Sequence, residues 1–162
     1  MVKTGGTDGV GTPPRYGERR ISKELYKKLR SKTPTKELQD KMNEGVILPI
    51  DDPVLAGKKV ETALEADHIV PMDKIAKMEN FDKLTFEQQV KILNNPENFT
   101  ALSKSANTSK KAKSYEDWTH YKKGKPGEIE VNPDFRKEMI KKEKELERKI
   151  QKLIDDLLNT DE

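Results

Sequence analysis

The C-terminal segment constrains the fold most, because it carries a single apolar stripe in a strongly charged sequence. Asn132 and Pro133 supply an N-cap and a first-turn proline, so we predict that a helix begins there. Apolar residues then recur at steps of three and four: Met139, Ile140, Leu146, Ile150, Leu153, Ile154, Leu157 and Leu158. One face of this helix, over about 133–159, must therefore be covered, either by the core or by a second copy of the chain.

Composition limits the core that this helix can join. Of 162 residues, 32% are hydrophobic and 38% are charged, so the buried centre must be small and much of the surface must be solvated charge. This length suits one domain, and we expect a helix-rich domain of the α+β class. The chain has no cysteine, which excludes disulfides, Cys-ligated zinc and thiol catalysis.

The N-terminal segment contains little that can be buried. Glycines and prolines dominate residues 1–17, which predicts a flexible linker or boundary segment, with one domain over 18–162. This segment lacks the basic-then-apolar pattern of a signal peptide, and no apolar run is long enough to cross a bilayer. We therefore expect no membrane contact, and any export must depend on something outside this sequence.

The middle of the chain predicts alternating short elements. The pattern indicates helices over about 22–31, 34–44, 72–80 and 85–93, and the start of another at 114–118. Extended segments are expected over 46–50, 60–70 and 98–102, and a polar helix over 103–113. The order strand, loop, strand, helix is therefore expected over about 60–113.

Four polar residues within this region have the chemistry to cut a phosphodiester. Asp67 and His68 are adjacent at the end of an expected strand, and Asn98 and Asn107 follow. An ionised Asp and an Asn carbonyl are hard oxygen ligands suited to Mg²⁺ or Mn²⁺, whereas a neutral imidazole takes a proton from water near pH 7. We therefore predict that Asp67 and Asn107 bind the metal and that His68 is the general base.

Positive charge is concentrated beside these residues. The net charge of +3, from 32 basic and 29 acidic residues, is too balanced to indicate nucleic-acid binding by itself. Between Ala101 and Tyr115, however, there is no acidic residue to offset the lysines Lys104, Lys110, Lys111 and Lys113. We predict that these lysines contact phosphate groups of DNA.

The motif resembles that of the HNH, or ββα-metal (His-Me finger), endonucleases. The resemblance rests on Asp67-His68-Ile-Val-Pro, then Asn98-Phe-x-x-Leu-Ser, then Ala-Asn107-x-Ser-Lys110, and it covers about 64–113. It implies a ββα-metal centre surrounded by N- and C-terminal helices. It also implies that Asn98 supports the loop and that Lys110 stands where a basic residue contacts phosphate.

The resemblance also bears on the metal and on the biological setting. Lys111 stands where the His-rich members of the family carry a further histidine, so Mg²⁺ or Mn²⁺ is expected rather than zinc. The Gly-rich start and the segment 114–121 resemble C-terminal toxin domains of bacterial polymorphic toxins. That likeness implies a secreted effector that cuts DNA in the target-cell cytoplasm, with a cognate immunity protein. A phage or restriction-type HNH enzyme, acting in the cytoplasm, shares the same site.

Several alternatives stay open at this level. One alternative is a non-catalytic nucleic-acid or protein-binding module on an HNH-like scaffold. Another is an RNase on the same scaffold. Asn98 is also a candidate for a turn residue that bonds its own backbone. His120 and Trp118 are expected to pack in a small aromatic cluster, and the arginines near the N-terminus are expected to be solvated.

Overall fold

The computed structural model describes residues 11–160, and residues 1–10, where most of the expected linker lies, are outside this range. The helices are α1 (Lys23–Arg30), α2 (Lys36–Met42), α3 (Met72–Ala76), α4 (Phe86–Leu93), α5 (Lys104–Lys110) and α6 (Pro133–Thr160), with 3-10 turns η1 (Phe81–Lys83) and η2 (Pro96–Asn98). Six strands within the described range form three antiparallel pairs: β1 (Ile50–Asp51) with β2 (Lys59–Val60), β3 (Glu65–His68) with β4 (Phe99–Leu102), and β5 (His120–Tyr121) with β6 (Ile129–Glu130). This mixture of helices and small sheets is the expected α+β class.

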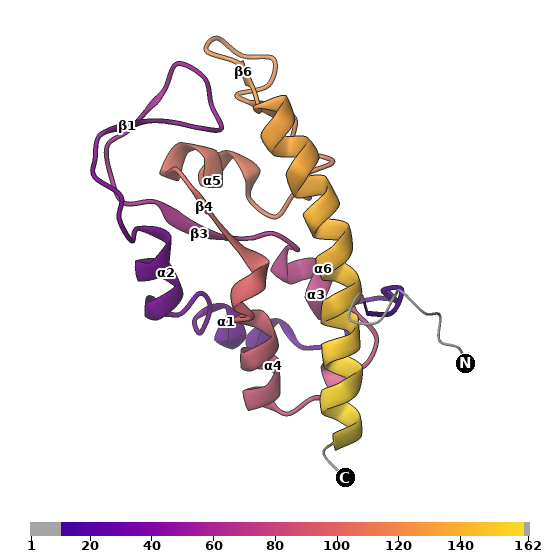
Figure 1. Cartoon of the computed structure of the whole chain (residues 1–162). Helices are drawn as coiled ribbons and strands as arrows, with labels where there is room; N and C mark the ends of the chain where they lie inside the picture. The colour runs from indigo at the N-terminus through magenta and orange to yellow at the C-terminus, as the bar shows by residue number, and fades with distance from the viewer. Residues whose placement is uncertain (1–10, 161–162) are drawn as a thin grey trace.

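Helix α6 runs along one side of the molecule as a single long helix (Figure 1). Its apolar stripe faces the interior, where Met139, Leu146, Ile150 and Ile154 are buried. Leu153 lies at the edge of the stripe and stays 40% exposed. The stripe is therefore part of the core, which decides between the two kinds of cover that the sequence allowed.

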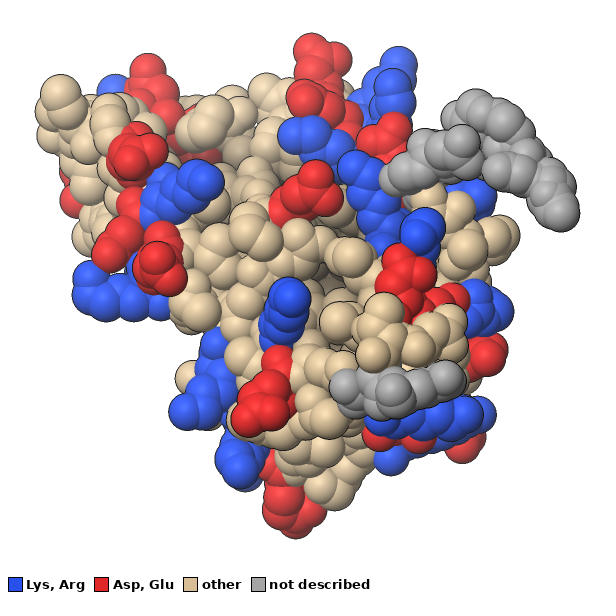
Figure 2. All heavy atoms as spheres, turned by 60° about the horizontal axis from the view of Figure 1, so that its bottom comes forward, with Lys and Arg blue, Asp and Glu red and all other residues tan. Residues whose placement is uncertain are grey.

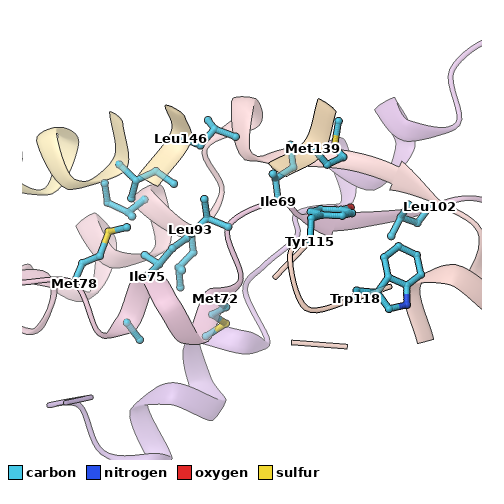
Figure 3. Close-up of a cluster of buried hydrophobic side chains, with 14 of the residues drawn as sticks. Ile69, Met72, Ile75, Met78, Leu93, Leu102, Tyr115, Trp118, Met139 and Leu146 are labelled. Carbon is cyan, nitrogen blue, oxygen red and sulfur yellow. The ribbon is translucent and has the colours of Figure 1, made fainter. Parts of the chain in front are cut away.

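The core joins elements that are far apart in the chain. Ile75 and Met78 meet Leu93 from α4, and Leu146 lies above them on α6 (Figure 3). Towards the other end of the same cluster Tyr115 packs beneath α6, and burying such apolar side chains contributes about 1.5–3 kcal/mol each. The core therefore ties α6 to the segment that follows β3.

The pair β3–β4 and helix α5 place the predicted motif. In the antiparallel register Asp67 is opposite Thr100 and His68 is opposite Phe99. The Ser103 hydroxyl then accepts a hydrogen bond from the Ala106 N–H, which starts α5 directly after β4. The expected order of strand, loop, strand and helix is confirmed, and it brings Asp67, His68 and α5 together.

Residues 46–49 are not in a strand, and the helix expected over 72–80 ends at Ala76. Two further segments also differ from the sequence-based expectation. Arg15 lies within the expected linker, yet its guanidinium donates to both carboxylate oxygens of Asp155 at 2.8 Å, so the chain is held against α6 from there. Residues 114–118 form one turn and not a helix, since the N–H groups of Asp117 and Trp118 both donate to the Ser114 carbonyl. Burial of Tyr115 and Trp118 fixes that turn in place of helix continuation.

The surface carries the charge that composition requires. Lysines, arginines and carboxylates of both signs are interspersed over the face shown in Figure 2, around an uncharged central area. Within residues 11–160, none of the helices has the length and apolarity to cross a membrane.

Candidate active site at the end of strand β3

Three of the residues predicted for catalysis and metal binding line one pocket of about 590 Å³. Asp67 and His68 reach it from β3, and Asn107 reaches it from α5. Arg30, at the end of α1, closes another part of the wall, so a positive charge faces the cavity. Three of the four residues predicted to form the catalytic centre are therefore brought to one cavity, and the fourth, Asn98, lies beneath it.

His68 is held in one tautomer by a helix end. Its Nε2 lies 2.9 Å from the carbonyl oxygen of Leu93, the last residue of α4. Because a carbonyl only accepts hydrogen bonds, and the last carbonyls of a helix lack partners inside it, Nε2 must carry the proton. The Thr33 hydroxyl donates to the same carbonyl at 2.9 Å and lies 3.1 Å from Nε2.

The other ring nitrogen of His68 is left available. Nδ1 makes no hydrogen bond to any residue between 11 and 160, and it is not among the buried unpaired polar atoms of that range. In the neutral tautomer with Nε2–H, Nδ1 is a lone-pair acceptor. The ring is also packed against Phe99, with centroids 4.4 Å apart, so its direction is fixed.

The surroundings keep His68 neutral. Burial lowers the pKa of His68 to about 4, and the positive charges of Lys110 and Arg30 act in the same direction. The hydrogen bond with Leu93 partly opposes this shift. At neutral pH His68 is therefore unprotonated and competent to accept a proton.

Asp67 is almost fully buried beside a counter-charge. The Tyr115 hydroxyl donates to Oδ2 at 2.8 Å, and Nζ of Lys110 lies 3.3 Å from the carboxylate. Burial raises the pKa of Asp67, while Lys110 and the Tyr115 hydroxyl favour its charged form and limit the rise. The carboxylate of Asp67 is thus available at the pocket wall as an oxygen ligand, and Tyr115 and Lys110 already orient it.

Lys110 differs from its predicted role. It is 0% exposed, and its ammonium also lies 3.4 Å from the carbonyl oxygen of His68 and 4.6 Å from the centre of the Tyr115 ring. The position of Lys110 in the structure therefore does not support contact with phosphate. The reason is the α5 period, which turns this residue inwards to the buried carboxylate of Asp67.

Asn98 fastens the loop behind the site. It is 0% exposed, and its side chain makes both hydrogen bonds to one residue, accepting from the Val70 N–H at 2.8 Å and donating to the Val70 carbonyl at 3.1 Å. Its own carbonyl accepts from the Ile69 N–H at 2.8 Å. The side chain thus bridges to the segment after β3 and does not close a turn on its own backbone.

Asn107 has one side of its amide occupied. Its Nδ2 donates to Glu65 at 2.7 Å, which leaves the carbonyl oxygen available to a cation. Glu65 and Asp67 share a face of β3, because alternate residues of a strand point the same way. Between residues 11 and 160, no three His, Cys, Asp or Glu side chains gather in a metal-binding group, so Asn107 is needed to complete an oxygen-rich donor set.

The other predicted contacts lie outside the pocket or at its rim. Lys111 lines the pocket and is exposed, while Lys104 and Lys113 are exposed and line a neighbouring groove. His120 lies on β5, where its Nδ1 is 2.9 Å from the Thr119 hydroxyl. Trp118 is buried as expected, with its indole N–H donating to Ser109.

Sequence reasoning missed four groups that shape the site. Glu65 was recognisable, since a carboxylate two residues before Asp67 must share its side of the strand. Tyr115 was visible only as an aromatic residue near Trp118, and nothing indicated a bond to Asp67. Thr33 and the Leu93 carbonyl carry no local signal, because only the packing of α1 and α4 brings them to His68.

Residues 12–156 match the family described as the C-terminal domain of GmrSD restriction endonucleases. The chain belongs to this family, and it is therefore an HNH-type nuclease domain, which confirms the expected HNH resemblance. The resemblance to polymorphic toxins stays a prediction. No curated protein and no solved structure matches the chain significantly.

Proposed function

We propose that this domain is a metal-dependent endonuclease that hydrolyses phosphodiester bonds of DNA with little sequence preference. His68 is the general base, and Asp67 and Asn107 are the metal ligands. One observation carries the proposal: the Leu93 carbonyl fixes the proton of His68 on Nε2, so that Nδ1 is free beside a pocket that Asp67 and Asn107 also line.

The donor set fits a hard divalent cation. Asp67 offers a carboxylate, and Asn107 offers an amide oxygen that the bond from Nδ2 to Glu65 leaves unused. Two protein oxygens leave other positions for water and phosphate, which suits Mg²⁺ or Mn²⁺ better than zinc. Such an ion, when bound, stabilises negative charge on the phosphate and on the leaving oxygen.

The remaining steps belong to the chain itself. Nδ1 of His68 takes a proton from a water molecule, whose oxygen attacks phosphorus as the bond to the 3′ oxygen breaks. A low pKa makes a free imidazole a weak base, but a phosphate in the pocket opposes the positive charges of Lys110 and Arg30 that help to lower it. Burial, which is the main cause of the low pKa, stays in place, so this effect restores only part of the basicity of the ring. Asn98 acts as a positioning residue that holds the loop after β3.

The experiment is plasmid cleavage with matched histidine variants. Supercoiled DNA is incubated with the protein in Mg²⁺, in Mn²⁺ and in chelator, and the initial rates are compared. His68→Ala should lower the rate by about 10² to 10⁴-fold, the usual contribution of a general base. His120→Ala removes the only other histidine of the chain. It should lower the rate far less than His68→Ala, because His120 lines a neighbouring groove and not the catalytic pocket.

Other results of this experiment would contradict the proposed mechanism or favour one of the alternatives. Cleavage by His68→Ala at the wild-type rate would contradict the mechanism. Cleavage of RNA with intact plasmid would indicate the RNase alternative, and salt-sensitive DNA binding without strand breaks would indicate the binding module. Equal rates in Mg²⁺ and in chelator would rule out the metal-dependent reaction.

The biological setting is a separate proposal. The family is described as restriction endonucleases, which favours cleavage of foreign DNA inside the producing cell. A secreted effector with an immunity protein stays a prediction. It requires that expression of the domain kills bacteria, that His68→Ala abolishes killing, and that a protein encoded with it restores growth.

A further inference from the structure

A groove of about 880 Å³ lies along α5 beside the catalytic pocket. The β1–β2 hairpin contributes Lys58 and Lys59 to its lining. The region of α5 contributes Lys104, Lys111 and Lys113. We call this the lysine groove.

The β5–β6 hairpin supplies the third wall of the lysine groove with Lys122, Lys123 and Lys125. Among residues 11–160, only two carboxylates, Glu61 and Asp117, also line it. The whole chain has a net charge of only +3, so the residues outside the groove are net negative together. Positive charge is therefore concentrated in this groove, in contrast to the mixed signs of the face in Figure 2.

The lysines of the groove are available for a ligand. Within the part of the chain that the structure describes, Lys59 alone among them forms a salt bridge, with Asp51. The groove also meets the catalytic pocket, because Thr108 and Lys111 line both cavities. A polyanion bound beside His68 thus has a continuous positive path along α5.

The chemistry of the lysine groove favours a phosphate backbone over bases. Trp118 is 1% exposed and its N–H is used by Ser109, so the indole is not a stacking platform. The Tyr121 ring is half-buried, with the ammonium groups of Lys58 and Lys122 over it at 5.1 and 5.5 Å. What remains exposed is charge on long side chains, which positions a backbone without reading its sequence.

We propose that the lysine groove binds the duplex DNA backbone beside the scissile phosphate, as an extended substrate site formed mainly by the β1–β2 and β5–β6 hairpins. This inference rests on the nuclease function proposed above. It adds binding residues that lie outside the HNH motif, above all the hairpin lysines Lys122, Lys123 and Lys125.

The first test measures binding without cleavage. In the His68→Ala protein, the lysines at 122, 123 and 125 are replaced by glutamine, and affinity for a duplex oligonucleotide is measured by fluorescence anisotropy over a range of salt. We expect about tenfold weaker binding. A plot of log affinity against log salt should be less steep by roughly 2 to 3, because each lysine that no longer neutralises a phosphate leaves about one counterion on the DNA.

The control removes the same charge elsewhere. Lys141, Lys142 and Lys144 are exposed on α6 and line neither cavity, so their replacement by glutamine should change affinity less than about twofold. Circular dichroism confirms that both triple variants fold. Equal losses of DNA affinity in the two triple variants, or no loss in the groove variant, would overturn the proposal. Tighter binding of duplex RNA than of duplex DNA would overturn the assignment to DNA.

The second test separates this inference from the proposed reaction. With His68 intact, the groove variant should cut plasmid more slowly than wild type does. Both proteins should cut a duplex that is too short to reach the groove at the same rate. If wild type cuts plasmid and the groove variant is unaffected, the groove proposal fails and the nuclease stands. If no protein cuts but the groove variant alone loses DNA binding, the reaction fails and the groove stands.

Discussion

Lys110 and Lys111 are adjacent lysines, yet one lies in the buried interior and the other in a solvent-exposed surface region. Lys110 ends α5 with its ammonium buried beside Asp67 and Tyr115. Lys111 follows with a positive φ of 53°, and its side chain is exposed between the pocket and the lysine groove. Lys110 therefore belongs to a buried ion pair, whereas Lys111, the next residue, belongs to a solvated basic surface.

The difference shows how one segment serves two roles. In the interior, charge is costly unless each partner is satisfied, so Asp67, Lys110 and Tyr115 must remain together. In the groove, each lysine keeps its hydration and acts through the summed field. We therefore expect substitutions inside to change stability and substitutions in the groove to change only binding.

The largest effect should follow removal of the buried counter-charge. Lys110→Met leaves Asp67 buried without its ion pair and should cost about 3–5 kcal/mol in the free energy of unfolding, measured with urea. Lys111→Met, one residue on, should change stability by less than about 0.5 kcal/mol. A loss below about 1 kcal/mol at Lys110 would show that the pair does not hold this region together.

A somewhat smaller effect is expected at the loop behind the site. Asn98→Ala leaves the N–H and the carbonyl of Val70 without partners in a buried place, which should cost about 2–4 kcal/mol. Asn95→Ala is the control, since its side chain accepts one local hydrogen bond from the Glu97 N–H and should cost about 1 kcal/mol. If the two substitutions cost the same, Asn98 is not the loop support.

The tyrosine pair sharpens the same comparison. Tyr115→Phe removes the hydroxyl that donates to Asp67 and should destabilise the fold by about 1.5–3 kcal/mol. Tyr121→Phe, at the lysine groove, should be neutral within about 0.5 kcal/mol. Thermal unfolding of both variants measures the difference, and a neutral Tyr115→Phe would exclude a structural role for this bond.

The last comparison concerns pH. The folded pKa of His68, about 4, lies below its ordinary value of 6.5, so protonation favours the unfolded state. Its contribution to stability is complete above pH 6.5 and declines as the pH falls towards 4. In cleavage, kcat/KM reports the free enzyme and should hold down to about pH 5, whereas kcat should fall at a higher pH because bound phosphate raises the pKa. If kcat/KM instead fell with a midpoint at pH 6.5, the lowered pKa of the buried His68 would be wrong.

Local chemistry accounts for the elements that the sequence predicted. Thr85 and Gln88 form a capping box at the start of α4, and Ser22 and Ser103 cap α1 and α5. The stripe on α6 required cover at any location in the fold. Such signals depend on neighbours a few residues apart, so they are visible in the sequence.

The sequence did not predict the direction in which individual side chains point. Four lysines near α5 appeared alike in the sequence, and only the packing of α5 against Asp67 and Tyr115 shows that Lys110 is the buried one. Arg15 appeared to belong to a solvated terminus until Asp155 of α6 came within reach. These interactions join residues that are distant along the chain, and composition does not encode them.

By itself, the sequence determined the α+β class, the long amphipathic helix and the order of Asp67, His68, Asn98 and Asn107, because periodicity and capping act locally. The tertiary structure decided which nitrogen of His68 is free, which lysine is buried, and that two hairpins complete a basic groove. The physical reason is that burial and electrostatic field depend on which surfaces meet, and only the folded chain brings the Leu93 carbonyl to His68.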